Sequence, residues 1–466
     1  MNEVFIAWAG LIAIFFLRAL QNWKCTQAVI HSCSCMGSVI ARLLQWYSLA
    51  FLFLTLMLAR TFWDIVKYDY IGYNFLRSER IAENLELIKK DNPDVTSKEL
   101  SDLHLRPWLK ALSLSAPAVG VLTFLIVLYQ VRGLIRQSQR VRGPGDKYPW
   151  WMRDLMHVIV LVLANPLLFV VMSMRATIRV LAVMTGSAWI PQHRLPVEDR
   201  LTWAHIVDLE MSTFTADLEI AYAVQFFTVW IFGSMCGSLM AGADFLKLVP
   251  YQERQQYKKT MIYAAIQGIY AYVVIGLIRC GIDIAVAFLL QSDKPESRDK
   301  AAKLEDELLP KIATIFMFVT LLCIFNMIVI GKVKAITSAL GNATAKFLAL
   351  RLLLLIAQTQ LQILMGCTTG SKIYLNIMQH EGQIQPLLDK YVPSWHWQLT
   401  DWDFSEYQAK LLHASLLSYE CLVMVLLNLI CWKLNDEQAY KITAFTFKDH
   451  EHQKASGASE PLLHGY

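Results

Sequence analysis

The chain has 466 residues, of which 55% are hydrophobic and 17% charged, whereas an average soluble domain has about 45–50% apolar and about 25% charged residues. The mean hydropathy is +0.38 and the formal net charge is +5, which excludes an ordinary soluble enzyme, a disordered chain and a nucleic-acid-binding protein. The apolar residues come in long runs between short polar stretches, so the sequence predicts an all-α polytopic membrane protein in contact with membrane lipid.

Nine runs of about 20 mostly apolar residues, each long enough to cross a bilayer, follow one another along the chain. The first two, 4–20 and 43–63, form a two-span N-terminal hairpin within residues 1–63. A soluble segment, 64–106, comes next, in which Thr96 and Glu99 have the spacing of a helix capping box and Pro107 is expected to close a short helix. A seven-helix core is predicted over 107–440, with a tail at 441–466. The seven predicted spans are 112–131, 155–174, 220–240, 261–278, 312–330, 347–367 and 411–432.

The distribution of Lys and Arg over the loops predicts the orientation. Alternate loops, at 18–42, 132–154, 241–260 and 331–346, hold 16 basic and 4 acidic residues in all. The other loops, at 64–111, 175–219, 291–311 and 368–410, hold 20 basic and 26 acidic residues. Because positively charged loops stay in the cytosol, we expect the N-terminus and the 64–106 segment outside and the C-terminal tail inside.

Motifs for catalysis or metal binding are missing from the sequence. It contains no H-E-x-x-H, G-x-S-x-G, P-loop, G-x-G-x-x-G or paired C-x-x-C. His380 and His396 have spacings that match no metal template. We therefore expect no enzymatic activity, no metal site and no cofactor.

Ionisable residues inside the predicted spans are the candidate functional residues, because each costs about 2.5–3.5 kcal/mol at the centre of a membrane helix and so faces protein or water. Glu420 lies near the middle of the last span, with His413 seven residues before it and Asn428 eight after it. This spacing is consistent with one polar stripe. The stripe either lines a path for a solute or a proton, or contains a neutral glutamic acid that holds helices together.

Arg351 and the amides that follow it form a second polar group. Arg351, Gln358 and Gln362 are spaced by seven and four residues and share one helix face. They line a polar interior, or else Arg351 extends to the membrane interface and the amides join neighbouring helices.

Cys33 and Cys35 lie in the first predicted cytosolic loop, close to a span. Juxtamembrane cytosolic cysteines are candidates for reversible palmitoylation. The alternative is that both remain unmodified thiols.

Four short motifs in the core occur in the same order as in a known transporter family. They are Tyr148-Pro149-Trp150-Trp151-Met152-Arg153 with Pro166 and Ser173 beyond it; Leu218-Glu219-Ile220 with Phe226-Phe227; Lys346-Phe347 with Arg351 and Gln358 to Gln362; and Tyr419-Glu420-Cys421. On these motifs the 107–440 core resembles the organic solute transporter alpha-subunit family of seven-helix membrane proteins. The chain departs from the family pattern at Met152 and Leu218, where glutamine and tyrosine are usual, and in its extra N-terminal hairpin.

The resemblance implies a facilitative carrier of small amphipathic organic solutes that sometimes needs a small single-span partner subunit. The location expected for this membrane protein is the plasma membrane or an endomembrane. Its solute path, or polar core, would include Glu219, Arg351, Gln358, Gln362, His413 and Glu420. The rival interpretation is a non-transporting receptor, trafficking factor or scaffold subunit, in which the same residues only lock helices together.

Overall fold

The computed structural model describes residues 46–68, 76–142, 155–196, 198, 200–241, 259–290, 292, 295–333, 336–337, 340–380 and 404–433. In this part of the chain, seven helices are long and apolar enough to cross a membrane. The prediction of an all-α protein with a seven-helix membrane core is confirmed to that extent. The helices are α7 (Pro107–Arg142), α8 (Leu155–Met184), α10 (Trp203–Ala241), α13 (Lys259–Leu290), α15 (Leu309–Gly331), α17 (Ala343–His380) and α20 (Glu406–Cys431). Two short elements, α14 (Pro295–Lys303) and a π-helical turn (Leu304–Leu308), lead into α15.

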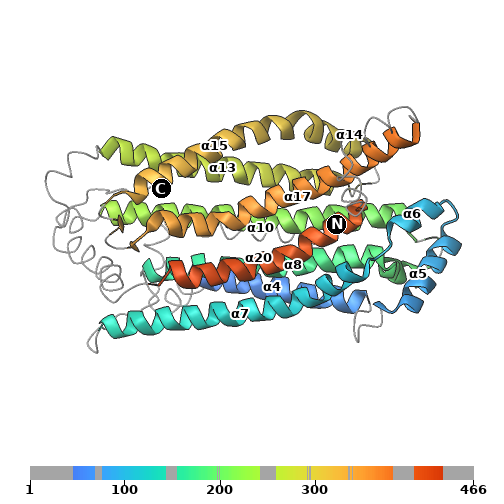
Figure 1. Ribbon diagram of the computed structural model, residues 1–466, viewed down its shortest axis with the longest axis horizontal. Helices are drawn as coiled ribbons and strands as arrows, with labels where there is room; N and C mark the ends of the chain where they lie inside the picture. The colour runs from blue at the N-terminus through green and yellow to red at the C-terminus, as the bar shows by residue number, and fades with distance from the viewer. Residues whose placement is uncertain are drawn as a thin grey trace, which may run out of the picture.

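The long helices run side by side along the length of the molecule (Figure 1). Helices α8 and α10 form its centre. In the most apolar stretch of each helix, the share of residues that are buried is 94% for α8 and 78% for α10, compared with 28% for α7 and 22% for α15. α8 packs against α10, α20, α7 and α4, and α10 also packs against α13. An apolar helix that neighbouring helices surround is a core helix. The apolar faces left for lipid therefore belong mainly to α7, α15 and α13, the last of which is 33% buried.

Only the second half of the predicted N-terminal hairpin lies within the described residues. The predicted span 4–20 and the two cysteines Cys33 and Cys35 lie outside the described residues. The predicted span 43–63 overlaps helix α4 (Trp46–Lys67), which packs against α8. The second predicted span therefore corresponds to a helix that is part of the bundle.

The segment between α4 and α7 forms two short helices at one end of the bundle, α5 (Ser78–Asp91) and α6 (Ser97–Asp102) (Figure 1). The predicted capping box is confirmed: Thr96 Oγ1 accepts from the Glu99 amide, and Glu99 Oε2 accepts from the Thr96 amide. The expectation for Pro107 was wrong, because this residue begins α7 instead of closing α6. Proline suits the first turn of a helix, where its missing N–H has no partner to lose.

Several helices are longer than the predicted spans, and the predicted loop 175–219 is mostly helical. α8 continues to Met184 and α10 begins at Trp203, so the connection between them is short and contains a 3₁₀ turn (Ser187–Trp189) and helix α9 (Ile190–His193). The predicted spans ended before Arg175 and began after Glu219. In the folded chain Arg175 and Arg179 of α8 pair with Asp217 of α10, so these charges are accommodated inside the helices.

Close contact between α10 and α13 depends on Gly276. A Cβ at this position would lie 2.5 Å from a ring carbon of Phe226, a fully buried residue between Tyr272 and Phe316. We expect Gly276→Ala to lower the free energy of unfolding by about 1–3 kcal/mol, because the ring has to shift within a packed core. Gly133→Ala is the matched control, because nothing lies within 4 Å of its Cβ position. Thermal unfolding of both purified variants tests this, and equal melting temperatures would contradict it.

Candidate functional site

Three polar side chains meet between α17 and α20 inside the bundle. Gln360 Nε2 donates a 2.8 Å hydrogen bond to Glu420 Oε1. The other end of the same amide, Gln360 Oε1, lies 2.8 Å from His413 Nδ1. His413 is fully buried and Glu420 half-buried. One glutamine of α17 thus links His413 and Glu420 of α20.

The hydrogen bonds of this cluster determine which atoms remain available. Because Gln360 Oε1 can only accept, His413 donates from Nδ1 and its Nε2 is an acceptor. His413 Nε2 and Glu420 Oε2 are both buried and have no hydrogen-bond partner among the described residues. Two acceptors without donors can take hydrogen bonds from the hydroxyl or amine groups of a solute, or a proton.

The sequence prediction placed Glu420 and His413 in one group, and the structure brings them together. The residue that links them is Gln360, the middle one of the three glutamines on α17. The predicted polar face of Arg351, Gln358 and Gln362 did not include it. Gln358 is half-buried on α17, and Gln362 lies on the same helix with a side chain outside the described part. The spacing on one helix could not reveal Gln360, because its partners belong to another helix.

Glu219 belongs to a neighbouring cluster. It is buried on α10 and faces the Cys280 thiol and the Arg279–Asp283 pair of α13, in which Arg279 Nε lies 3.8 Å from Asp283 Oδ2. Tyr222, one turn further along α10, is buried against the Phe169 ring, and its hydroxyl has no hydrogen-bond partner among the described residues.

Arg351 lies at a third position. Its side chain is 1% exposed, donates from a terminal nitrogen to the carbonyl oxygen of Thr320 at 3.2 Å, and places Cζ 4.3 Å from the centre of the Tyr272 ring. Arg351 is therefore enclosed by side chains and backbone of neighbouring helices. Within the described part of the chain no carboxylate forms an ion pair with it.

A network of buried charges, which the sequence prediction missed, joins α4, α8 and α10 toward the end of the bundle that carries α5. It consists of three arginines and three carboxylates: Arg60, Arg175, Arg179, Asp64, Glu210 and Asp217. All except Arg60 are less than 5% exposed. Lys67, whose side chain is 35% exposed, adds a further positive charge 3.7 Å from Glu210. Each buried carboxylate therefore has at least one cationic partner, which is the condition for burying so many charges.

Arg179 is the centre of this network. It donates from Nε to Asp217 and from a terminal nitrogen to Glu210, both at 2.9 Å, and its other terminal nitrogen lies 3.6 Å from Asp64. Tyr68, in the turn after α4, donates a 2.5 Å hydrogen bond to Glu210, and burial together with this carboxylate raises the pKa of the Tyr68 phenol. One side chain on α8 thus holds acidic groups from α4 and α10.

A sequence signal for this network exists. Arg175 and Arg179 are spaced by four residues and Glu210 and Asp217 by seven, so each pair lies on one helix face. The prediction assigned these four residues to an outside loop, and their spacing was therefore not considered.

The short helices at the end of the bundle are fixed by Asp91. Its carboxylate accepts from Trp189 Nε1 at 3.1 Å and from an Arg200 nitrogen at 3.3 Å, and it lies 2.8 Å from His193 Nδ1. The hydrogen bond with His193 is the main cause that lowers the pKa of the Asp91 carboxyl. This carboxylate stays ionised near neutral pH and ties α5 to the α8–α10 connection.

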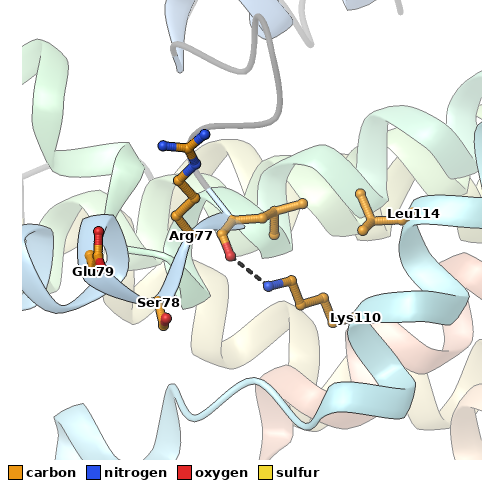
Figure 2. Close-up of a pocket in the computed structure, with 6 residues that line it drawn as sticks. Arg77, Ser78, Glu79, Lys110 and Leu114 are labelled. Carbon is orange, nitrogen blue, oxygen red and sulfur yellow. Dashed lines mark hydrogen bonds between the residues drawn. The ribbon is translucent and has the colours of Figure 1, made fainter.

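An open pocket of about 600 Å³ lies beside α5. Its lining residues are Leu76, Arg77, Ser78, Glu79, Lys110 and Leu114. Figure 2 shows Lys110 Nζ donating to the carbonyl oxygen of Leu76, at 2.5 Å. None of the predicted site residues lines this pocket, so it is separate from the polar clusters of the bundle.

Comparisons with known proteins add no relative: no family model, curated protein or solved structure matches this chain. Among the described residues, no group of three or more His, Cys, Asp or Glu side chains could hold a metal ion. The fold therefore defines an integral multi-pass membrane protein with seven candidate spans and polar clusters inside the bundle.

Proposed function

We propose that this chain is a facilitative carrier, and not an enzyme, that lets small amphipathic organic solutes cross the membrane down their gradient. One observation carries the proposal: Glu420 and His413, within an apolar helix, each present an acceptor atom without a partner among the described residues. A purely structural pair would be expected to use both acceptors, because buried polar atoms are normally hydrogen-bonded. Acceptors left over at this depth suit a transient ligand.

The neighbouring clusters extend this path. Glu219 is buried on α10 one turn from Tyr222, whose hydroxyl has no partner among the described residues, and it faces the Arg279–Asp283 pair of α13. Polar groups at successive positions let a solute exchange one set of hydrogen bonds for another as it moves. The resemblance of the core motifs to the organic solute transporter alpha-subunit family supports the same function, and by that resemblance we propose a single-span partner subunit.

We propose nine spans in all, with the N-terminus outside and the C-terminal tail in the cytosol, in the plasma membrane or an endomembrane. The alternation of basic and acidic loops supports this orientation. Protease protection of tags placed in sealed cells tests it. A tag in the 132–154 loop should resist protease added from outside, and cleavage there would reverse the orientation.

The second candidate function is a non-transporting receptor, trafficking factor or scaffold subunit. The buried network around Arg179 favours it, because six paired charges across three helices hold those helices in one arrangement. A carrier would have to move its other helices, α13, α15, α17 and α20, against this rigid part.

Uptake into vesicles decides between the two functions. The full-length chain is purified and reconstituted, and entry of a panel of radiolabelled amphipathic solutes is compared with entry into protein-free vesicles. We expect saturable, protein-dependent uptake of at least one solute in the absence of an ion gradient. Equal uptake with and without the protein, across the panel and with correctly folded protein, would favour the scaffold or receptor.

A further inference from the structure

Arg351 is a buried cation without a counter-ion among the described residues. It lies eight residues into α17, about 12 Å from the start of that helix. The groups that it contacts are a backbone carbonyl, that of Thr320, and the face of the Tyr272 ring. Neither carries a negative charge. A guanidinium at this depth is costly unless an anion compensates it.

Three buried polar atoms in the residues around Arg351 have no hydrogen-bond partner among the described residues, and all three can donate a hydrogen bond. Arg351 Nε, Tyr272 Oη and Thr320 Oγ1 each expose less than 1 Å² and have no hydrogen-bond partner among the described residues. They belong to three residues on three helices, α17, α13 and α15, that contact one another through the guanidinium. All three atoms can donate a hydrogen bond, and Nε can only donate. An acceptor that carries negative charge would balance the arginine and take hydrogen bonds from donors of this kind.

We propose that Arg351, Tyr272 and Thr320 bind a small inorganic anion of the size of chloride within the bundle. The small size follows from the packing, since Tyr272 stacks on Phe316 at 5.4 Å and is itself fully buried. A larger organic acid would have to displace these rings. The bound anion neutralises Arg351 and joins α13, α15 and α17.

Chloride-dependent stability of the full-length protein tests this site. The protein is purified in gluconate buffer, and its melting temperature is followed as chloride replaces gluconate at constant ionic strength. We expect a saturable rise of about 2–4 °C, because a ligand that binds only the folded state stabilises it. Bromide should act like chloride. The same melting temperature in chloride and in gluconate would overturn the proposal.

Variants connect the response to these residues. Tyr272→Phe and Thr320→Val each remove one hydroxyl with little change of shape, and each should raise the half-saturating chloride concentration about tenfold, which is the effect of losing one hydrogen bond to a charged group. Arg351→Gln should abolish the response.

The matched control is Thr314→Val. Thr314 lies on the same helix as Thr320, and its hydroxyl donates to the carbonyl oxygen of Pro310, so this variant should respond like the original protein. A normal response in both hydroxyl variants, or an altered one in Thr314→Val, would refute the site. The test does not measure uptake, so its result is independent of the proposed transport.

Discussion

Replacing Arg179 by glutamine is expected to lower the free energy of unfolding by about 3–5 kcal/mol, the range for breaking a buried ion pair from one side. The reason is electrostatic. The variant leaves Asp64, Glu210 and Asp217 buried with fewer positive partners, and glutamine cannot reproduce the two 2.9 Å bonds of the guanidinium. The melting temperature of purified full-length protein measures this effect.

Two further variants separate charge from packing. Arg80→Gln removes an arginine whose ion pair with Glu83 is equally direct, at 3.1 Å, but exposed to solvent. It should change the melting temperature little, because exposed pairs contribute little. Adding Asp217→Asn to Arg179→Gln should restore part of the lost stability, because it removes a buried carboxylate that has lost one of its two arginine partners. If the double variant is less stable than Arg179→Gln, the repulsion argument is wrong.

Glu420→Gln is expected to reduce solute uptake by about tenfold or more, equivalent to about 1.4 kcal/mol of lost stabilisation in the rate-limiting step. An amide oxygen at this position can still accept from Gln360, so the contact between α17 and α20 is retained. What the variant loses is the charge and the proton affinity of the carboxyl group. Initial uptake rates, normalised to the amount of folded protein, provide the measurement.

The control for Glu420→Gln is Glu406→Gln on the same helix. Glu406 lies in the first turn of α20, is 49% exposed and pairs with Lys410 at 2.7 Å. Its substitution also removes one carboxylate and should leave uptake unchanged. Uptake by Glu420→Gln at the original rate would show that Glu420 is structural and would favour the scaffold or receptor.

The sequence by itself determined the class of protein and the positions of its membrane helices. Each of the seven core spans is recognisable because a bilayer requires about 20 apolar residues in a row, and such a run is local information. The capping box at Thr96 and Glu99 is local for the same reason, since both partners lie within one turn. Glu420 and His413 could be singled out because an ionisable residue inside an apolar run is exceptional wherever the run packs.

Only the tertiary structure decided which polar residues meet. Gln360 is one of three similar glutamines, and its role depends on His413 and Glu420 of α20, more than fifty positions later in the chain. The extension of α8 beyond Met174 and the early start of α10 could not be predicted, because charged residues such as Arg179 and Asp217 are typical of a loop when each is considered alone. In the bundle these two residues form an ion pair between the helices. The burial of Arg351 depends on Tyr272 and Thr320 from two other helices. Hydrophobic length is a property of a single segment, whereas the pairing of buried charges and amides is a property of neighbours that only the packed bundle defines.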